Sequence, residues 1–305
     1  MITSTSTRTS TRTGTSKGRR RAVRVGAHGT HRLRRRMGLA LVWLLILAAL
    51  LVFDFPLLST LATSFKTDAQ IELTPPQWIF PPTFDHYHNV FFAIGFQYSA
   101  FLVNSLVVAL LASVLVTAIA FPASYALVRL RVGTKRLFPF VVSMRFMPPI
   151  VFALPTYLFF QRVGLLDTQV GLALINALFN VGFGLLFLTT FLQDLPPEIE
   201  ESAMIDGAGT ATLLLRVVLP LTAPAIAATS ALVFIWTWNE FLFALMLTVR
   251  NATTATVGSS FFITAYGIRW GDISAAISVS IIPTLLFTFA AQRWIVRGLT
   301  VGAVK

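Results

Sequence analysis

The stretch EIEESAMIDGAGTATLLLRVVLP, residues 198–220, determines how the rest of the chain is interpreted. Together with the residues just before it, this stretch holds five of the twelve acidic residues of the chain: Asp194, Glu198, Glu200, Glu201 and Asp206. Long apolar segments lie on both sides of it. So much carboxylate in one short segment of an apolar chain indicates a surface that is offered to a partner.

The amino-acid composition indicates a membrane protein. Of the 305 residues, 55% are hydrophobic and 12% are charged, whereas soluble domains contain about 25% charged residues. The chain has no cysteine, which excludes disulfides, thiolate metal sites and cysteine nucleophiles. It has no GxxxxGK[S/T] phosphate-binding loop and no arrangement of catalytic side chains. Gly133-Thr-Lys135 resembles such a loop only superficially. We therefore expect a non-enzymatic chain that holds no cofactor or metal of its own.

The net charge of +12 belongs to the N-terminal segment. Residues 1–36 contain eleven Lys and Arg and no acid, and the remainder is nearly neutral. This composition, rich in Ser, Thr and Arg, predicts a disordered cytoplasmic tail. A nucleic-acid-binding arm, an organelle transit peptide and a topological anchor all fit it, and the anchor is favoured because an apolar run follows at once. Met37 begins that run, so an upstream extension of little function is a further alternative.

Six apolar segments are predicted to cross the membrane, which makes residues 37–305 an all-α transmembrane domain. They are Gly38–Phe53, Phe101–Val128, Leu137–Phe160, Val170–Leu192, Pro224–Leu247 and Ile273–Ile295. A bilayer core of ~30 Å needs about 20 apolar residues. The first segment is interpreted as a retained span and not as a signal peptide, because more spans follow. Residues 54–99 hold too many prolines for a span and are expected to form an external loop with a short helix near His86–Ile94.

The distribution of Lys and Arg predicts the orientation of these spans. With both termini in the cytoplasm, the inner segments carry 19 Lys and Arg and the outer segments carry 4. Without the N-terminal tail the counts are still 8 and 4. Because positive residues are enriched on the cytoplasmic side of membrane proteins, the acidic segment 194–221 is expected to face the cytoplasm.

Segment 194–221 is predicted to contain a helix of two to three turns. Its acids suit the positive end of a helix dipole. Residues that commonly begin or end helices are spaced accordingly: Asp194, Pro196 and Pro197 at the start, Gly207 and Gly209 at the end, and Thr210 as the cap of a second helix that enters the membrane. An ordinary polar connector would have about 2–8 residues. A short helix that lies against a cytoplasmic partner is therefore favoured over a connector.

The spacing within this segment resembles the EAA signature of permease subunits in binding-protein-dependent ABC importers. The signature is Glu-Ala-Ala, three residues, Gly, nine residues, a branched apolar residue, one residue and Leu-Pro. Every interval matches at Glu201-Ser202-Ala203, Gly207, Val217, Leu219 and Pro220. Ser202 and Val217 depart from the usual Ala and Ile by small changes that keep the shape. The resemblance extends over residues 37–305 and is greatest to the second, maltose-type permease of sugar importers, as in Trp78–Asn89, Asn104-Ser105, Trp238–Leu242 and Arg297–Lys305.

The resemblance implies a type I ABC importer permease fold, with six transmembrane helices and a cytoplasmic coupling helix that docks on an ATPase. The residues that it assigns to coupling are Glu201, Ser202, Ala203, Asp206, Gly207 and Pro220. The implied partners are a second permease subunit, two ATPase subunits that bind ATP and Mg, an extracytoplasmic sugar-binding protein and membrane lipid, without nucleic acid. The implied function is import of a sugar or polyol across the bacterial cytoplasmic membrane by alternating access.

Charged residues within the predicted spans are candidates for the translocation pathway, because a charge inside a bilayer is costly and usually faces the bundle interior or water. Arg145 lies in the third span beside Pro148-Pro149, and Glu240 lies next to Asn239 in the fifth. At ~1.5 Å per residue, Arg145 would be roughly 12 Å and Glu240 roughly 24 Å from the inner surface, which argues against an ion pair between them. Holding helices together is the alternative role for both.

The sequence leaves two other functional classes open. An ion-coupled secondary transporter would need carboxylates or His within its spans and often has internal repeats. Only Glu240 qualifies, and no repeat is visible. A membrane-anchored nucleic-acid-binding protein would use residues 1–36, and deleting them distinguishes it from a transporter.

Overall fold

The computed structural model describes residues 27–93 and 97–301. The chain divides into two compact units, Met1–Pro56 and Leu57–Lys305. Residues 1–26 of the predicted tail lie outside the described residues, and α1 (Ala27–Thr63) begins upstream of the boundary expected for that tail. Within α1, Gly38–Thr63 is long and apolar enough to cross a membrane. Its large apolar side chains are exposed, among them Trp43 (68%) and Phe53 (82%), so this helix needs lipid or another helix around it.

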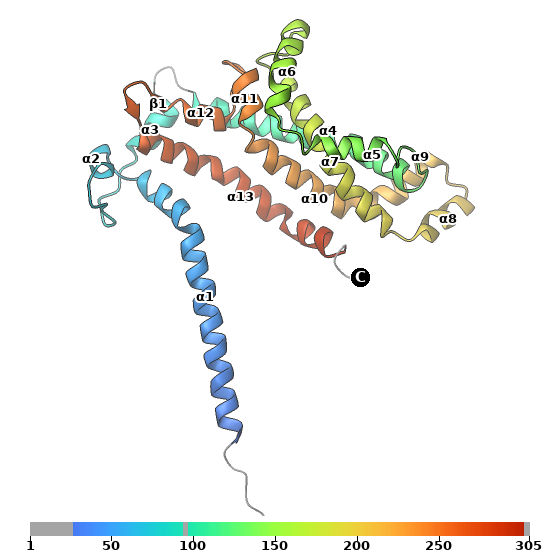
Figure 1. The fold of residues 1–305 in the computed structure, drawn as a ribbon, viewed down its shortest axis with the longest axis horizontal. Coiled ribbons are helices and arrows are strands. Elements are labelled where there is room, and N and C mark those ends of the chain that lie inside the picture. The colour runs from blue at the N-terminus through green and yellow to red at the C-terminus, as the bar shows by residue number, and fades with distance from the viewer. Residues whose placement is uncertain (1–26, 94–96, 302–305) are drawn as a thin grey trace, which may run out of the picture. The chain divides into compact units, whose positions relative to one another are not determined.

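Four long helices form the centre of the second unit: α4 (Tyr98–Val128), α7 (Gln169–Gln193), α10 (Leu219–Trp238) and α13 (Trp270–Val301), as Figure 1 shows. Small side chains lie between them, and Ala109, Ala112 and Ala120 of α4 are fully buried. At Gly184 of α7, a Cβ would lie only 2.8 Å from Cγ1 of Val116, so the close approach of α7 to α4 requires glycine. Packing through small residues is how apolar helices associate in lipid, where burial of apolar surface gives little gain.

Five helical segments of the described chain are long and apolar enough to cross a membrane: Gly38–Thr63, Tyr98–Val128, Gln169–Gln193, Thr210–Trp238 and Trp270–Gln292. The predicted third span, Leu137–Phe160, is not one helix. It consists of α5 (Leu137–Met144) and α6 (Ile150–Val163), which are separated by residues 145–149. Pro148 and Pro149 lack a backbone N–H, and each disfavours helical backbone at the residue before it. The third apolar segment is therefore interrupted at the proline pair that the sequence shows beside Arg145.

Shorter elements lie between the long helices. α2 (Asp68–Ile71) and α3 (Asp85–Phe92) fall within the segment that was predicted to be a proline-rich loop. α3 confirms the short helix expected near His86–Ile94, although Ile94 lies outside the described residues. Between α10 and α13 lie α11 (Leu242–Leu247), α12 (Ala255–Ser260) and an antiparallel hairpin of β1 (Ile263–Thr264) and β2 (Gly267–Ile268).

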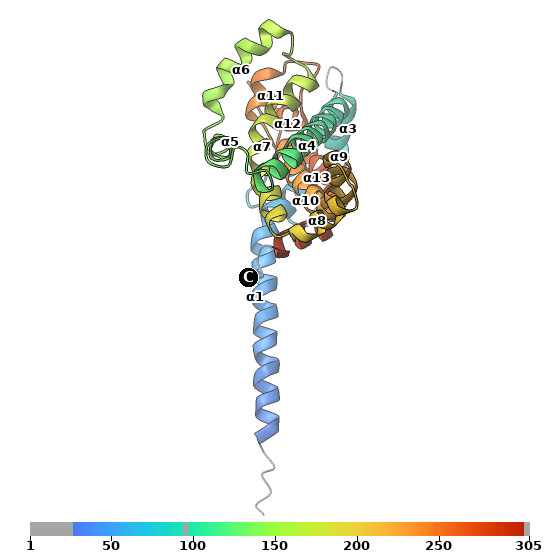
Figure 2. The same ribbon diagram turned by 90° about the vertical axis from the view of Figure 1, so that its right-hand side faces the viewer.

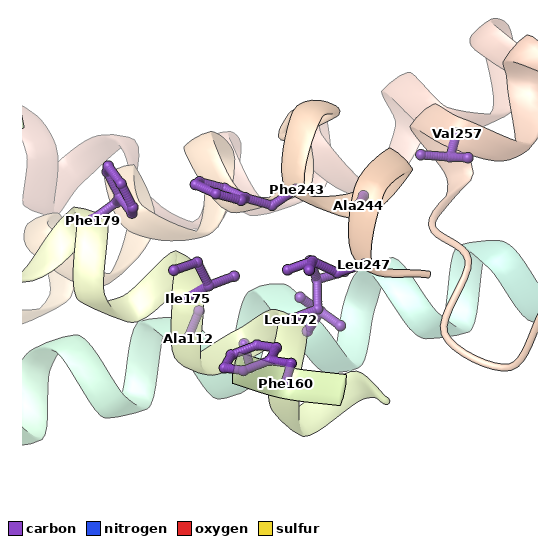
Figure 3. Close-up of a cluster of buried hydrophobic side chains, with 11 residues drawn as sticks. Ala112, Phe160, Leu172, Ile175, Phe179, Phe243, Ala244, Leu247 and Val257 are labelled. Carbon is purple, nitrogen blue, oxygen red and sulfur yellow. The ribbon is translucent and has the colours of Figure 1, made fainter. Parts of the chain in front are cut away.

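One buried apolar cluster joins α6 and α11 to the long helices. Phe160 of α6, Leu172 and Phe179 of α7, and Phe243 and Leu247 of α11 belong to it, and Figure 3 shows them gathered between the ribbons. The ring centroids of Phe179 and Phe243 lie 5.0 Å apart. The fifth predicted span therefore consists of α10, which ends at Trp238, and of the separately anchored α11.

The acidic segment forms the connection from α7 to α10. α8 (Pro197–Ile205) lies at the end of the unit that is shown on the right of Figure 1, and Figure 2 faces this end. A single turn, α9 (Thr210–Thr212), and a π-helix, η1 (Leu213–Val218), then lead into α10. The predicted short helix and the predicted second helix are both confirmed.

Candidate functional site

The ends of α8 follow from proline and glycine chemistry. Pro197 opens the first turn, as predicted, but Pro196 is the N-cap residue, and Asp194 closes α7 and does not cap α8. At the other end Gly207 has a φ of 86°, the left-handed region that glycine adopts without a steric penalty. The N–H of Gly207 donates to the carbonyl of Met204 and that of Ala208 to the carbonyl of Ala203, both at 3.0 Å. These two bonds make a Schellman motif, which gives α8 a fixed end.

One face of α8 is free within the described chain. Glu201, Ser202 and Asp206 are exposed, and the large apolar side chains Met204 and Ile205 are 52% and 85% exposed. We call these five residues the outer face of α8. Apolar side chains surrounded by carboxylates at the tip of a protruding helix are typical of a surface that docks into a groove of another protein.

The opposite face of α8 is tied to the rest of the chain. Glu200 is only 3% exposed. Its Oε1 accepts from Nε of Arg129 at 2.7 Å, and its Oε2 accepts from the hydroxyl of Tyr125 at 3.1 Å. Ala203 packs against an apolar cluster that includes Leu213. The sequence analysis assigned Glu200 to the same helix-starting acids as its neighbours and used Arg129 only to count charges, so it missed this arrangement.

The connection from α8 to α10 differs from the prediction at its cap. Gly209, and not Thr210, occupies the N-cap position of α9. Its extended backbone, with φ of −71° and ψ of 162°, is the usual conformation of an N-cap residue. Pro220 lies in the first turn of α10, which continues directly from η1. Leu213 and Val218 of η1 are buried, so the path between Gly207 and Pro220 passes over the same apolar cluster as Ala203.

Arg145 contacts α10, the helix that ends just before Asn239 and Glu240. The guanidinium of Arg145, in the break between α5 and α6, lies 4.4 Å from the ring centroid of Trp236. The two carboxylate oxygens of Glu240 accept the backbone N–H groups of Phe243 and Ala244 at 2.8 and 3.0 Å, which caps α11. Asn239 is exposed and donates to its own helix. The ion pairs found among the described residues do not include Arg145 or Glu240.

An aspartate that has no distinguishing motif in the sequence holds two loops together. Asp167, between α6 and α7, has a φ of 53°. Its carboxylate accepts the backbone N–H groups of Val249, Arg250, Asn251 and Ala252 at distances of 2.9 to 3.1 Å. Burial acts to raise the pKa of Asp167, but the four N–H bonds outweigh it, so this pKa lies below its ordinary value. An Asp in a short loop carries no distinguishing pattern in a sequence.

Residues 118–301 match the family described as "Binding-protein-dependent transport system inner membrane component". This range includes α8, Gly207 and Pro220. The chain belongs to this family. It is therefore a permease subunit of an ABC importer, a multi-pass inner-membrane component whose ATP is hydrolysed by a separate subunit.

Relatives of this inner-membrane component match almost from end to end. The trehalose/maltose transport system permease protein MalG of Thermococcus litoralis is 33% identical over 268 residues, which are 86% of this chain and 96% of that protein. The diacetylchitobiose uptake system permease protein DasC of Streptomyces coelicolor is 35% identical over 270 residues, 87% of this chain and 97% of that protein. A probable ABC transporter permease protein, y4oR of Sinorhizobium fredii, is 35% identical over 266 residues, with 87% and 95% covered.

The fold of the permease is also found in a solved structure. A crystal structure of a bacterial ABC transporter that is involved in the import of the acidic polysaccharide alginate contains a chain with a TM-score of 0.68 to this one. The two are 22% identical, and the similarity covers 86% of this chain and 97% of that chain. The helical architecture of the second unit is therefore that of an ABC importer permease.

Proposed function

We propose that this chain is a sugar-translocating permease subunit which receives ATP-driven motion through α8. The observation that carries this proposal is the two-sided character of α8. Its outer face carries both polar and apolar side chains, which are exposed in the described part of the chain. Its inner face is bound to the long helices, through Glu200 and Arg129. The EAA spacing from Glu201 to Pro220 falls on this same helix and its connection to α10.

The coupling residues divide into three groups by position. Glu201, Ser202 and Asp206 belong to the outer face and would contact an ATPase subunit. Ala203 is half-buried and seats the helix. Gly207 fixes its end and Pro220 begins the next long helix. Motion of the ATPase would thus displace α8, and α8 would displace α10 through the connection of α9 and η1.

Six membrane crossings follow if α5 and α6 together form the sixth. They contain 8 and 14 residues and run in different directions in Figures 1 and 2, so this crossing would be bent at residues 145–149 and not a straight helix. An even number of crossings with α8 in the cytoplasm leaves both termini in the cytoplasm, as the Lys and Arg distribution predicts. The break at Arg145 is then at membrane depth, where irregular backbone is tolerated if it lines a cavity or is buried in protein.

The substrate class rests on the relatives that are named for trehalose, maltose and diacetylchitobiose. We propose a sugar as the substrate, delivered by an extracytoplasmic binding protein. A second permease subunit would cover the exposed apolar helices that lipid does not. Arg145, Asn239 and Glu240 remain candidates for lining the pathway, with Arg145 the strongest because its cation is not neutralised by a carboxylate within the described residues.

The direct test is Glu201→Lys in the assembled complex, with Glu72→Lys as the matched control. Both glutamates are exposed, but Glu72 follows α2, in the loop that is predicted to be external. We expect Glu201→Lys to abolish co-purification with the ATPase and uptake of radiolabelled maltose or trehalose, and Glu72→Lys to leave ATPase assembly intact. Normal assembly and uptake with Glu201→Lys would refute the assignment of the outer face.

A second experiment separates ATP-driven import from the ion-coupled alternative. In proteoliposomes that hold the whole complex, we expect uptake into the vesicle to require ATP in the lumen, on the side of the ATPase subunits. We expect this uptake to persist when a protonophore and a sodium ionophore collapse the ion gradients. Uptake that continues without ATP and stops with the ionophores would favour a secondary transporter.

A further inference from the structure

The polar contacts of Glu200 differ from those of every other acid in its segment. Its side chain is 5% exposed and that of Arg129 is 18% exposed. Removing a carboxylate from water is costly unless each oxygen finds a donor. Both oxygens of Glu200 have one, from Arg129 and from Tyr125. This buried pair, whose hydrogen bonds are satisfied, lies on a segment in which the other acidic side chains are exposed.

Arg129 connects three helices at one point. It is the C-cap residue of α4, so its cation also lies at the negative end of that helix. Besides the bond to Glu200, its Nη2 donates to the carbonyl of Leu195 at 2.8 Å. Leu195 lies between the end of α7 and the start of α8. A guanidinium can make these two bonds in fixed directions, which a lysine ammonium cannot reproduce.

The two ends of α8 are held by different contacts. Its C-terminal end is closed by backbone hydrogen bonds of its own exit, those of Gly207 and Ala208. Its N-terminal entry passes through Pro196 and Pro197, whose φ angles are fixed, and is bonded to Arg129 through Leu195. The side-chain bonds that join α8 and its entry to the end of α4 are therefore made at the Glu200 end.

We infer that Glu200, Arg129 and Tyr125 are positioning residues which lock α8 to the ends of α4 and α7. With this lock, a push on the outer face of α8 moves α4 and α7 as one body with it. Without the lock, part of the push is absorbed by rocking of α8 in its loop. This inference rests on the proposed coupling function of α8 and adds the route by which the motion enters the helical core.

The route is physically suited to transport. α4 and α7 pack closely along their lengths, through contacts such as Gly184 with Val116 and Ala120. α4 also packs against α10, through the cluster of Ala109, Phe234 and Trp238. A shift that enters at the Arg129 end is therefore shared by three of the long helices.

The test uses Glu200→Gln and Arg129→Lys in the assembled complex, with the outer face left unchanged. The measured quantity is the amount of sugar transported per ATP hydrolysed, at matched amounts of ATPase bound. We expect co-purification to be kept and this ratio to fall about tenfold, the factor that corresponds to loss of one charge-assisted hydrogen bond. The combination of both substitutions should be no worse than either alone. An unchanged ratio in both variants overturns the inference.

Glu201→Lys distinguishes this inference from the proposed function of α8. If Glu201→Lys releases the ATPase while Glu200→Gln leaves the transport ratio normal, the docking face is correct and the lock is wrong. If neither substitution has an effect, α8 is not the coupling element at all.

A second measurement leaves Glu200 and Arg129 unchanged, so it remains possible if the variants at these positions fail to assemble. The chain has no cysteine, so Glu198→Cys on α8 and Leu130→Cys beyond Arg129, both exposed, can carry a nitroxide pair. We expect the distance between the two labels to be the same in the nucleotide-free and the ATP-bound complex, while the separation of either from the second permease changes. A change in the distance between α8 and α4 on ATP binding overturns the lock.

Discussion

Replacement of Gly207 by alanine tests how far coupling depends on a fixed end of α8. Gly207 has a φ of 86°, and no heavy atom lies within 4 Å of the position that a Cβ would take. The cost is therefore confined to the backbone, about 1–2 kcal/mol for a non-glycine residue in the left-handed region. Asparagine tolerates this region better, so Gly207→Asn should cost less.

The loss should be visible as faster hydrogen exchange of two amides, those of Gly207 and Ala208, which close the Schellman motif. Because ~1.4 kcal/mol corresponds to a tenfold change in a local opening equilibrium, Gly207→Ala should accelerate their exchange by about tenfold. The assay is hydrogen–deuterium exchange with mass spectrometry on the purified complex, alongside sugar uptake. We expect uptake to fall in the order wild type, Gly207→Asn, Gly207→Ala.

Gly164→Ala is the matched control. Gly164 ends α6 with a φ of 72° and has the same open space around its Cβ position, so alanine there costs a similar backbone free energy far along the chain from α8. If Gly164→Ala and Gly207→Ala reduced uptake equally, the effect would be one of general stability. If Gly207→Ala left amide exchange around α8 unchanged, the reasoning from the left-handed φ would be refuted.

Three further substitutions have defined outcomes. Asp167→Asn should lower the free energy of unfolding at pH 7 by about 1–2 kcal/mol, since a partly exposed charged acceptor is lost. Because the pKa of Asp167 is lowered in the fold, its contribution to stability is full above the ordinary aspartate pKa of ~3.9 and disappears as pH falls through the lowered value. Thermal melts of variant and wild type should therefore converge at acid pH. Glu240→Leu removes the acceptor for two N–H groups of α11 and should cost about 1–2 kcal/mol, whereas Glu240→Gln should cost less; equal melting temperatures for the two would contradict the capping role. Gly184→Ala places a Cβ 2.8 Å from Val116 Cγ1 and should destabilise by about 1–3 kcal/mol, a loss that Val116→Ala should partly reverse in the same melting assay.

Local chemistry made much of the fold predictable. Runs of apolar residues located the long helices, and the proline pair at 196–197 and the glycine at 207 located α8. These features work through the backbone of a few adjacent residues, so they can be recognised without a structure. The break at Pro148-Pro149 was visible in the same way, although a hydropathy count alone does not register it.

Features that depend on helix phase and on distant partners were not predictable. Glu200 and Glu201 are neighbours with the same charge, yet one is buried and the other exposed. The dipole of α8 favours both, so propensity cannot distinguish them. The distinction comes from Arg129 and Tyr125, more than seventy residues earlier in the chain. Asp167 is comparable, because the four N–H groups that it accepts follow about eighty residues later.

Glu200 is buried and Glu201 is exposed, so the two neighbouring glutamates of α8 face different partners. A docking helix that only bound a partner would need no buried charge on its inner face, because an apolar seat such as that of Ala203 is cheaper in free energy. A helix that must also transmit displacement needs contacts with direction, since apolar packing allows sliding and hydrogen bonds of fixed geometry do not. In the proposed mechanism, Glu201 contacts the ATPase subunit and Glu200 passes the displacement of α8 on to Arg129. The EAA spacing records only the receiving residue, and the residue before it carries the connection to the core.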